Sequence, residues 1–224
     1  SNTVAVARDA AAHLRPGTVF LDLNSASPGA KRQAAGLVEA AGGRYVEAGV
    51  MTSVPPYGIR VPMLLGGPHA EALAERLRAF GMDATAVSPE LGVASAIKMC
   101  RSVFVKGLEA LTTEALRAAR HYGAEDEVLA SLAASYPSMG WDKELPDYLI
   151  SRIAVHGRRR AAEMREVAKT LTDAGVAPRL ASATAALEDA LIDALEAAGL
   201  PSGAAAEGDD FSWRQMADAL AKKA

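Results

Sequence analysis

In the first 90 residues, hydrophobic positions recur in two patterns, one typical of strands and one typical of helices. After residue 90 only the helical pattern remains. Short apolar runs rich in β-branched and aromatic residues predict strands, and segments with a 3.6-residue repeat between them predict helices. The expected strands are 18–23, 44–50, 61–65 and 82–87, and the expected helices are 4–14, 27–41 and 68–80. Strands that alternate with helices predict an α/β layer with a largely parallel sheet.

Strand signals stop after Ser88-Pro89. Residues 90–122 predict one helix of roughly 50 Å, and further helices are expected at 125–135, 145–174, 178–199 and 211–222, with a flexible link at 203–208. The pattern therefore predicts two domains. Residues 1–89 form an α/β domain, and residues 90–224 form an all-helical domain that begins with the long interdomain helix.

Composition narrows the classes of function. Half of the 224 residues are hydrophobic and the formal net charge is −3, which gives no general attraction to nucleic acid or to an anionic membrane. No apolar run approaches the roughly 20 residues that span a bilayer, and the first residues do not have the pattern of a signal peptide. The single cysteine, Cys100, fits a reducing, cytoplasmic setting. No zinc or calcium motif is present, so we expect no metal site.

Lys98 is the first candidate for chemistry. It lies in a helical segment that is apolar on nearly every face, Leu91-Gly92-Val93-Ala94-Ser95-Ala96-Ile97-Lys98. Desolvation lowers the pKa of a lysine, which suits the amine to proton exchange near neutral pH. Ser102 follows one turn later on the same face and could hold a second substrate oxygen. The alternative is an ordinary solvated lysine.

Two polar segments follow expected strands. Asp22-Leu23-Asn24-Ser25-Ala26-Ser27-Pro28 offers hydroxyls and free amides at a helix start, although Ser27 could simply cap that helix. Met51, Thr52 and Ser53 also follow a strand, at the edge where open α/β sheets bind ligands. The alternative is an ordinary loop.

A basic segment offers anion recognition. Residues 152–169 contain five arginines and one lysine against two glutamates. Arg158 and Arg159 are the candidates for holding an anionic substrate. The alternative is a solvated helix face on which glutamates at helical spacing pair with the arginines.

The order of these segments resembles the β-hydroxyacid dehydrogenase superfamily, which includes 3-hydroxyisobutyrate and 6-phosphogluconate dehydrogenases. The resemblance rests on Asp22 to Pro28, on the strand that ends at Gly66-Gly67, and on the helix that opens at Gly92 and carries Lys98. Val50-Met51-Thr52-Ser53 replaces a Val-Ser-Gly-Gly-like segment, and Ser102 stands where the family usually has asparagine. Residues 94–99 and 156–166 resemble a poorly characterised branch with a phosphogluconate-dehydrogenase-like C-terminal domain.

The resemblance implies an NAD(P)-dependent oxidoreductase. It implies that residues 1–89 are the later half of a Rossmann domain and that residues 90–224 bind substrate and form a homodimer. Lys98 would be the general acid–base, Asn24 and Ser25 would contact NAD or NADP, and the substrate would be a small anionic hydroxy acid. Met51, Thr52, Ser53, Ser102, Arg158 and Arg159 would bind that substrate.

The family's glycine-rich loop would precede residue 1, because no Gly-x-Gly-x-x-Gly occurs in this sequence. Two alternatives stay open. One is a relative of the imine reductases, which lack the lysine. The other is a non-catalytic dimerisation or binding module that has no complete nucleotide site.

Overall fold

The structure is a computed structural model that describes residues 2–208 and 211–222. It consists of two compact units. The α/β unit comprises Ser1–Val103 and Arg165–Pro178, and the helical unit comprises Phe104–Met164 and Arg179–Ala224. The last strand ends at Ser88, so strands stop where the sequence predicts. The α/β unit nevertheless includes residues 90–103 and 165–178, which come from the segment expected to form the helical domain.

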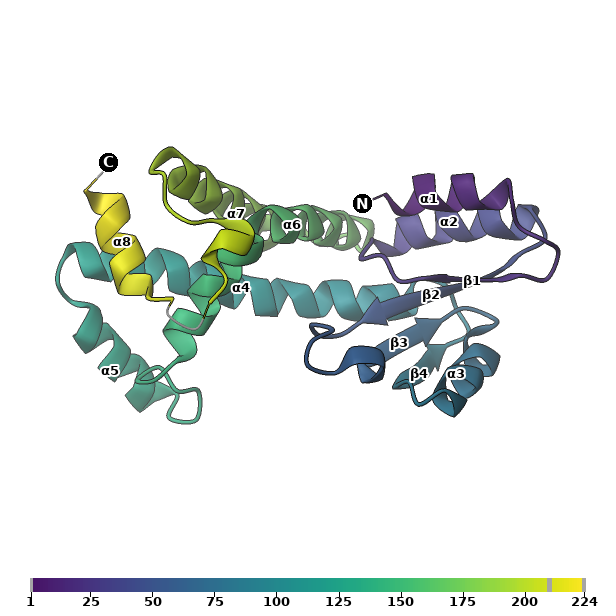
Figure 1. The fold of residues 1–224 in the computed structure, drawn as a ribbon, viewed down its shortest axis with the longest axis horizontal. Coiled ribbons are helices and arrows are strands. Elements are labelled where there is room, and N and C mark those ends of the chain that lie inside the picture. Colours follow the sequence, from purple (N-terminus) through teal and green to yellow (C-terminus); the bar gives the residue numbers. More distant parts are fainter. Residues whose placement is uncertain (1, 209–210, 223–224) are drawn as a thin grey trace. The chain divides into compact units, whose positions relative to one another are not determined.

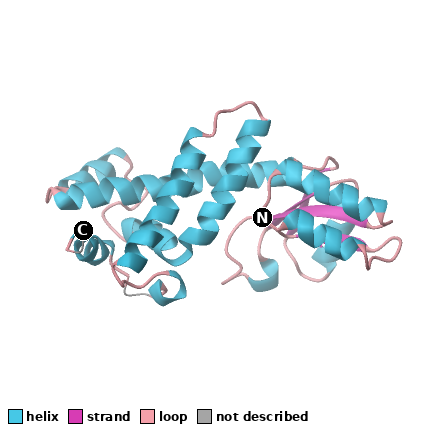
Figure 2. Cartoon of the chain, turned by 90° about the horizontal axis from the view of Figure 1, so that it is seen from above, coloured by secondary structure: helices cyan, strands magenta, loops and turns pink. Residues whose placement is uncertain are grey.

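The helices and strands agree closely with the expected elements (Figures 1 and 2). They are α1 (Thr3–Ala11), β1 (Val19–Asp22), α2 (Pro28–Ala40), β2 (Arg44–Val50), β3 (Met63–Gly66), α3 (Ala70–Ala79), β4 (Ala84–Ser88), α4 (Val93–His121), α5 (Glu125–Ser135), α6 (Leu145–Asp173), α7 (Arg179–Ala197) and α8 (Trp213–Ala221), with 3-10 turns η1 (Gly58–Arg60) and η2 (Gly203–Ala206). The expected flexible link at 203–208 therefore contains a 3-10 turn.

The sheet has the order β1-β2-β3-β4. The β1–β2 and β3–β4 pairs are parallel, whereas β2 and β3 run antiparallel with Val50 opposite Met63. Residues 51–62, which join β2 to β3, contain only the short turn η1, and parallel neighbours need a longer crossover that usually contains a helix. The predicted fold class is confirmed, with one antiparallel pair in a mostly parallel sheet.

Helices cover both faces of the sheet (Figure 1). Strand β2 alternates its side chains between the faces, as the two-residue repeat of a strand requires. Tyr45 packs with residues of α1 and α2, whereas Val46 and Ala48 pack with α3. The sheet is therefore buried on both sides, which is typical of α/β proteins.

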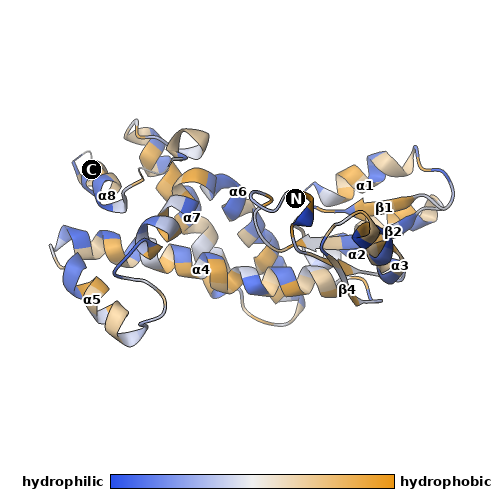
Figure 3. Cartoon of the chain, turned by 60° about the horizontal axis from the view of Figure 1, so that its bottom comes forward, coloured by the Kyte–Doolittle hydropathy of each residue, from blue (hydrophilic) through white to orange (hydrophobic). Residues whose placement is uncertain are grey.

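The helical unit has its own apolar core. Leu116 from α4, Ile153 from α6, Leu191 from α7 and Trp213 from α8 belong to one buried cluster. Figure 3 shows apolar and polar residues alternating along the helices of this unit, as expected for helices that bury one face. Tertiary packing of that face supplies most of the stability of such helices.

A buried ionic cluster lies beside this core. Arg160 pairs with Glu109 through a short contact to both carboxylate oxygens, and its Nε lies 3.9 Å from Glu188. Lys106 pairs with Glu163 at 2.8 Å. Burial raises the pKa of Glu188 to about 8, although the charges of Arg160 and Lys106 oppose the shift. Within the described residues neither oxygen of Glu188 has a hydrogen-bond partner.

Candidate active site

Asp22 organises the loop that follows β1. One carboxylate oxygen accepts hydrogen bonds from the Asn24 backbone amide at 3.0 Å and from its side-chain amide at 2.8 Å. The other oxygen accepts from the Tyr45 hydroxyl at 2.6 Å. Burial raises the pKa of Asp22, but the charge of Lys31 and these hydrogen bonds outweigh burial and hold it below its ordinary value. The carboxylate is thus ionised and fixes the loop that carries Asn24.

Lys31 is the buried cation of this loop. Its side chain is almost completely inaccessible, and its Nζ lies 3.1 Å from the Asp22 carboxylate and donates to the Asp22 carbonyl at 2.9 Å. Burial lowers the pKa of Lys31, and the charges of Asp22 and Glu47 oppose that shift. Buried charges are costly unless they are paired, so one lysine stabilises two carboxylates here.

Glu47 fixes the start of α4. It is fully buried in β2, and one of its oxygens accepts from the backbone amides of Gly92 at 2.8 Å and Ala94 at 3.0 Å. The first amides of a helix have no partner within the helix and carry a partial positive charge, so a carboxylate stabilises them. A Cβ at Gly66 would lie 2.5 Å from this oxygen, which explains the glycine at the end of β3.

The same face of β2 also positions Lys98. Residues 45, 47 and 49 share one face because side chains alternate along a strand. A Cβ at Gly49 would lie 3.5 Å from the Cβ of Lys98, so glycine there lets the lysine stem lie against the strand. The half-buried Lys98 then donates a hydrogen bond from Nζ to the Ser25 hydroxyl at 2.6 Å. The two residues are 73 positions apart, and tertiary structure brings them together.

Glu166, near the end of α6, holds the start of α2. Its carboxylate accepts from the Ser27 backbone amide at 3.0 Å and pairs with Lys169 at 2.8 Å. Burial raises the pKa of Glu166, but the hydrogen bonds from Lys169 and Ser27 outweigh it and lower the pKa. Ser27 occupies the N-cap position without a side-chain capping bond. A residue far along the chain therefore supplies the cap that the sequence suggested for the Ser27 hydroxyl.

The predicted substrate residues of the α/β unit lie in different surroundings. Met51 directly follows β2, and its carbonyl lies 3.4 Å from Arg101, whose guanidinium donates to it. Thr52 and Ser53 are exposed. The buried Ser102 donates its hydroxyl to the Lys98 carbonyl at 3.0 Å. Their roles toward a substrate stay predictions.

Arg158 and Arg159 belong to the helical unit, where both are engaged in ion pairs. Arg158 contacts Asp189, Asp193 and Glu196. Arg159 pairs with Glu163 one turn along α6. The salt-bridged face, one of the two interpretations of this segment, accounts for these contacts, and a role in substrate binding stays a prediction.

In the described part of the chain, no group of three or more His, Cys, Asp or Glu side chains could hold a metal ion. None of the described helices is long and apolar enough to cross a membrane.

Two solved structures share the fold of this chain and about a third or more of its sequence. A conserved hypothetical protein from Sinorhizobium meliloti 1021 is 39% identical, with a TM-score of 0.80, over 100% of this chain and 72% of that protein. A conserved protein of unknown function, reported to be structurally similar to 3-hydroxyacid dehydrogenases, is 33% identical, with a TM-score of 0.70, over 86% of this chain and 71% of that one. The chain belongs to this family of 3-hydroxyacid dehydrogenase-like proteins.

More distant matches extend the likeness. A domain of unknown function, DUF1932, matches residues 119–191. A 3-hydroxyisobutyrate dehydrogenase from Salmonella typhimurium is 16% identical, with a TM-score of 0.65, over 91% of this chain and 74% of that protein, and so shares its fold. An uncharacterized 28.5 kDa protein from Methanothermus fervidus is 25% identical over 74% of this chain. The match spans 63% of that relative, which is less than two thirds of its length.

Sequence reasoning missed the residues that hold this site in place. Glu47 had a detectable signal, because a carboxylate in the middle of the short apolar strand 44–50 must find a buried partner. Lys31 and Glu166 had none, since a charged residue in a helix is ordinarily solvated. Tyr45 was indistinguishable from any aromatic core residue.

Proposed function

We propose that this chain is part of an NAD(P)-dependent oxidoreductase that moves a hydride between the nicotinamide cofactor and a small β-hydroxy acid. The 2.6 Å contact between Lys98 and Ser25 carries the proposal. It joins the candidate general acid–base to the candidate cofactor loop at the end of β1. Membership of a 3-hydroxyacid dehydrogenase-like family supports the reaction class.

Lys98 performs the proton transfer in this proposal. The bound nicotinamide would supply or take up the hydride at the carbinol carbon. In oxidation the neutral amine of Lys98 takes the proton of the substrate hydroxyl while the C–H bond breaks and the C=O bond forms. In reduction its ammonium returns a proton to the carbonyl oxygen. Ser25 orients the amine, and a positioned acid–base contributes about 10² to 10⁴ in rate.

The residues present fit only one end of a dinucleotide. Asn24 is exposed and Ser25 half-buried on a loop held rigid by Asp22, so both can face the nicotinamide end of the cofactor. The sequence has no Gly-x-Gly-x-x-Gly, whose amides would bind the pyrophosphate. We therefore expect the 224-residue chain alone to bind NADPH weakly or not at all. A fluorescence titration that gave micromolar affinity would contradict this expectation.

Lys98 provides the decisive test, in the complete protein with its nucleotide-binding segment. We expect Lys98→Met to lower the turnover of 3-hydroxy acids by about 10² to 10⁴. Lys98→Arg should be nearly as inactive, because a guanidinium does not release its proton near neutral pH. Lys143→Met, at an exposed position of the helical unit, is the control and should keep full activity.

Two outcomes would overturn the proposal. A Lys98→Met protein with more than about a third of normal turnover would remove the lysine from the mechanism. A complete protein that binds no nicotinamide cofactor would favour the non-catalytic binding module. Equal turnover of neutral alcohols and hydroxy acids would contradict only the anionic substrate.

We also propose that the protein is a homodimer through α4. Phe104 is 76% exposed and Leu111 is 64% exposed, and their seven-residue spacing places them on one face of the helix. Exposed apolar surface of this kind marks interfaces. Light scattering should give a dimer that Phe104→Glu converts to a monomer. A wild-type monomer at every concentration would contradict the proposal.

A further inference from the structure

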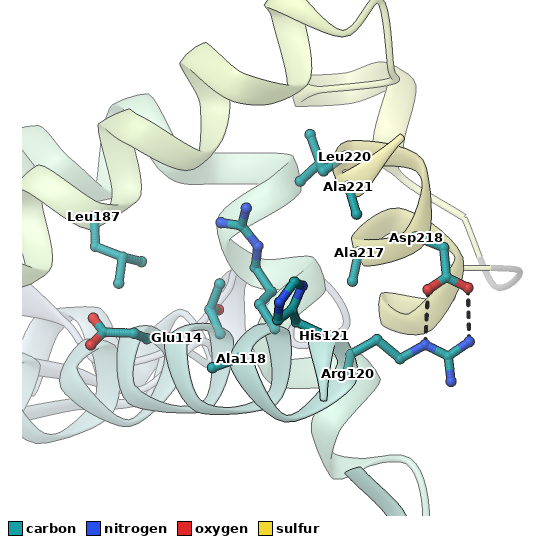
Figure 4. Close-up of a pocket in the computed structure, with 11 residues that line it drawn as sticks. Glu114, Ala118, Arg120, His121, Leu187, Ala217, Asp218, Leu220 and Ala221 are labelled. Carbon is teal, nitrogen blue, oxygen red and sulfur yellow. Dashed lines mark hydrogen bonds and ion pairs between the residues drawn. The ribbon is translucent and has the colours of Figure 1, made fainter. Parts of the chain in front are cut away.

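A pocket of about 510 Å³ lies wholly within the helical unit, between α4, α7 and α8. Its volume is in the range of small-molecule sites. None of its residues belongs to the α/β unit that holds Lys98. Figure 4 shows α4 as one wall, with Ala217 and Leu220 of α8 and Leu187 of α7 on other walls. The pocket is therefore separate from the candidate active site.

Of the polar side chains of α4 that line this pocket, three follow one another along the helix, namely Glu114, Arg117 and His121. Their spacing of three and four residues places them in one row on the helix surface. Glu114 lies toward Leu187, and His121 lies toward Ala217 (Figure 4). The row thus presents a carboxylate, a guanidinium and an imidazole in sequence.

Arg117 is the unusual member of this row. It is half-buried, and in residues 2–208 and 211–222 it has no hydrogen bond or ion pair. A partly desolvated guanidinium gains most from a carboxylate or phosphate, which it binds with two parallel hydrogen bonds. The negative end of the α4 dipole accounts for a cation such as Arg120 in the last turn, but Arg117 precedes that turn.

The neighbouring Arg120 does not compete for the same ligand. Its guanidinium donates to both oxygens of Asp218 at 2.9 and 2.8 Å and also contacts Glu125. The hydrogen bonds that Arg120 donates to Asp218 and Glu125 raise its pKa, so its charge is balanced by these two carboxylates. This ion pair ties α8 to α4 at the edge of the pocket. Arg117 and Glu114 are left as a cation and an anion without partners in the described residues.

We propose that this pocket binds a small zwitterion of the α-amino acid type with a branched aliphatic side chain. Arg117, with His121 beside it, binds the carboxylate. Glu114, one turn away, binds the ammonium group. Leu187 and Leu220 contact the aliphatic group. The proposal does not depend on the oxidoreductase function.

Calorimetric titration of the 224-residue chain tests this proposal with three matched probes. L-leucine carries both charges, 4-methylpentanoate lacks the ammonium group, and 3-methylbutylamine lacks the carboxylate. We expect L-leucine to bind with a Kd on the order of 1 mM or below, and the other two to bind at least about tenfold more weakly. Amide resonances of Ala217 and Ala221 should shift with L-leucine, because both residues line the pocket.

Single substitutions identify which side chain binds each charged group of the ligand. Arg117→Gln should weaken L-leucine binding about 10- to 100-fold. Glu114→Gln should reduce the affinity for L-leucine to that for 4-methylpentanoate and leave the latter unchanged. Arg179→Gln, an exposed change on α7 outside the pocket, is the matched control and should have no effect. Circular dichroism should show the same helix content for all three variants, because the altered side chains are not in the core.

Three results would overturn the proposal. One is no binding of L-leucine up to about 20 mM, well beyond the affinity expected for a ligand of this size. Another is equal affinity for L-leucine and 4-methylpentanoate, which would show that no ammonium site exists. The third is an Arg117→Gln protein that keeps its affinity within about threefold, which would place any binding elsewhere.

Discussion

The two units bury carboxylates in different ways. In the α/β unit, Glu47 and Glu166 accept hydrogen bonds from backbone amides at the starts of α4 and α2, and Asp22 binds the loop after β1. In the helical unit, Glu109 and Glu188 face the guanidinium of Arg160, a side chain on another helix. A carboxylate that binds backbone amides fixes the path of the main chain, whereas a carboxylate that binds a guanidinium fixes only the packing of side chains.

This difference fits the proposed function. In that proposal the α/β unit holds Lys98 at hydrogen-bond distance from Ser25, and its buried carboxylates fix the two segments that carry Lys98 and Ser25. The helical unit has no such requirement near Glu188, and this carboxylate lacks a hydrogen bond within the described residues. We therefore expect charge changes to affect geometry in the first unit and mainly pH-dependent stability in the second.

Lys31→Met should cause the largest loss of stability, in the α/β unit. It leaves Asp22 buried without its cation, and loss of one member of a buried pair costs about 3–5 kcal/mol. Hydrogen exchange at the amides of β2 and β3 would measure the loss. Both tryptophans, Trp141 and Trp213, lie in the helical unit, so their fluorescence serves as an internal control. Protection of β2 that stays unchanged would show that Asp22 does not need the lysine.

Glu188→Gln should change how stability depends on pH. The pKa of Glu188 is about 8 in the folded chain and 4.5 as a free group. Between these values the folded state keeps a proton that the unfolded state has lost, so stability falls as pH rises. The wild type should lose roughly 4 kcal/mol relative to the variant across that window. Urea unfolding at pH 5, 7 and 9, followed by tryptophan fluorescence, would measure the difference, and a constant difference would contradict the prediction.

Glu47→Ala should destabilise the α/β unit by about 2–4 kcal/mol. The buried amides of Gly92 and Ala94 would lose their acceptor, and each unsatisfied donor costs about 1–3 kcal/mol. Glu47→Gln keeps an acceptor oxygen and should cost only about 1 kcal/mol. Chemical denaturation monitored by circular dichroism would rank the two variants. Equal losses would mean that the charge, not the hydrogen bonds, holds α4.

Arg158→Gln should cause the smallest change in stability, in the helical unit. Arg158 and two of its partners, Asp193 and Glu196, are exposed, whereas Asp189 is half-buried and lies farther away, at 3.7 Å. Exposed ion pairs contribute little to stability. The tryptophan-monitored denaturation midpoint should not change measurably. In the complete protein, a large rise in KM for a hydroxy acid with this variant would instead support Arg158 as a substrate ligand.

Much of the fold could be predicted because local patterns dictate it. The strand 44–50 and the helix 125–135 lie at their expected positions, since β-branched runs and amphipathic repeats are local properties of the chain. The antiparallel pairing of β2 with β3 was not predicted from these patterns, although the helix-free loop between the two strands argues against a parallel crossover. It depends on which strand edges meet, and apolar runs do not encode direction.

The sequence by itself determined the elements, the change from α/β to helical structure after Ser88, and the candidate chemistry of Lys98 and Ser25. Only the tertiary structure decided that Lys98 reaches Ser25 and that Glu47 and Glu166 hold the helices on either side of that contact. The physical reason is the range of the interactions. A helix repeat is set by neighbours three and four residues away, whereas a buried charge finds its partner anywhere along the folded chain.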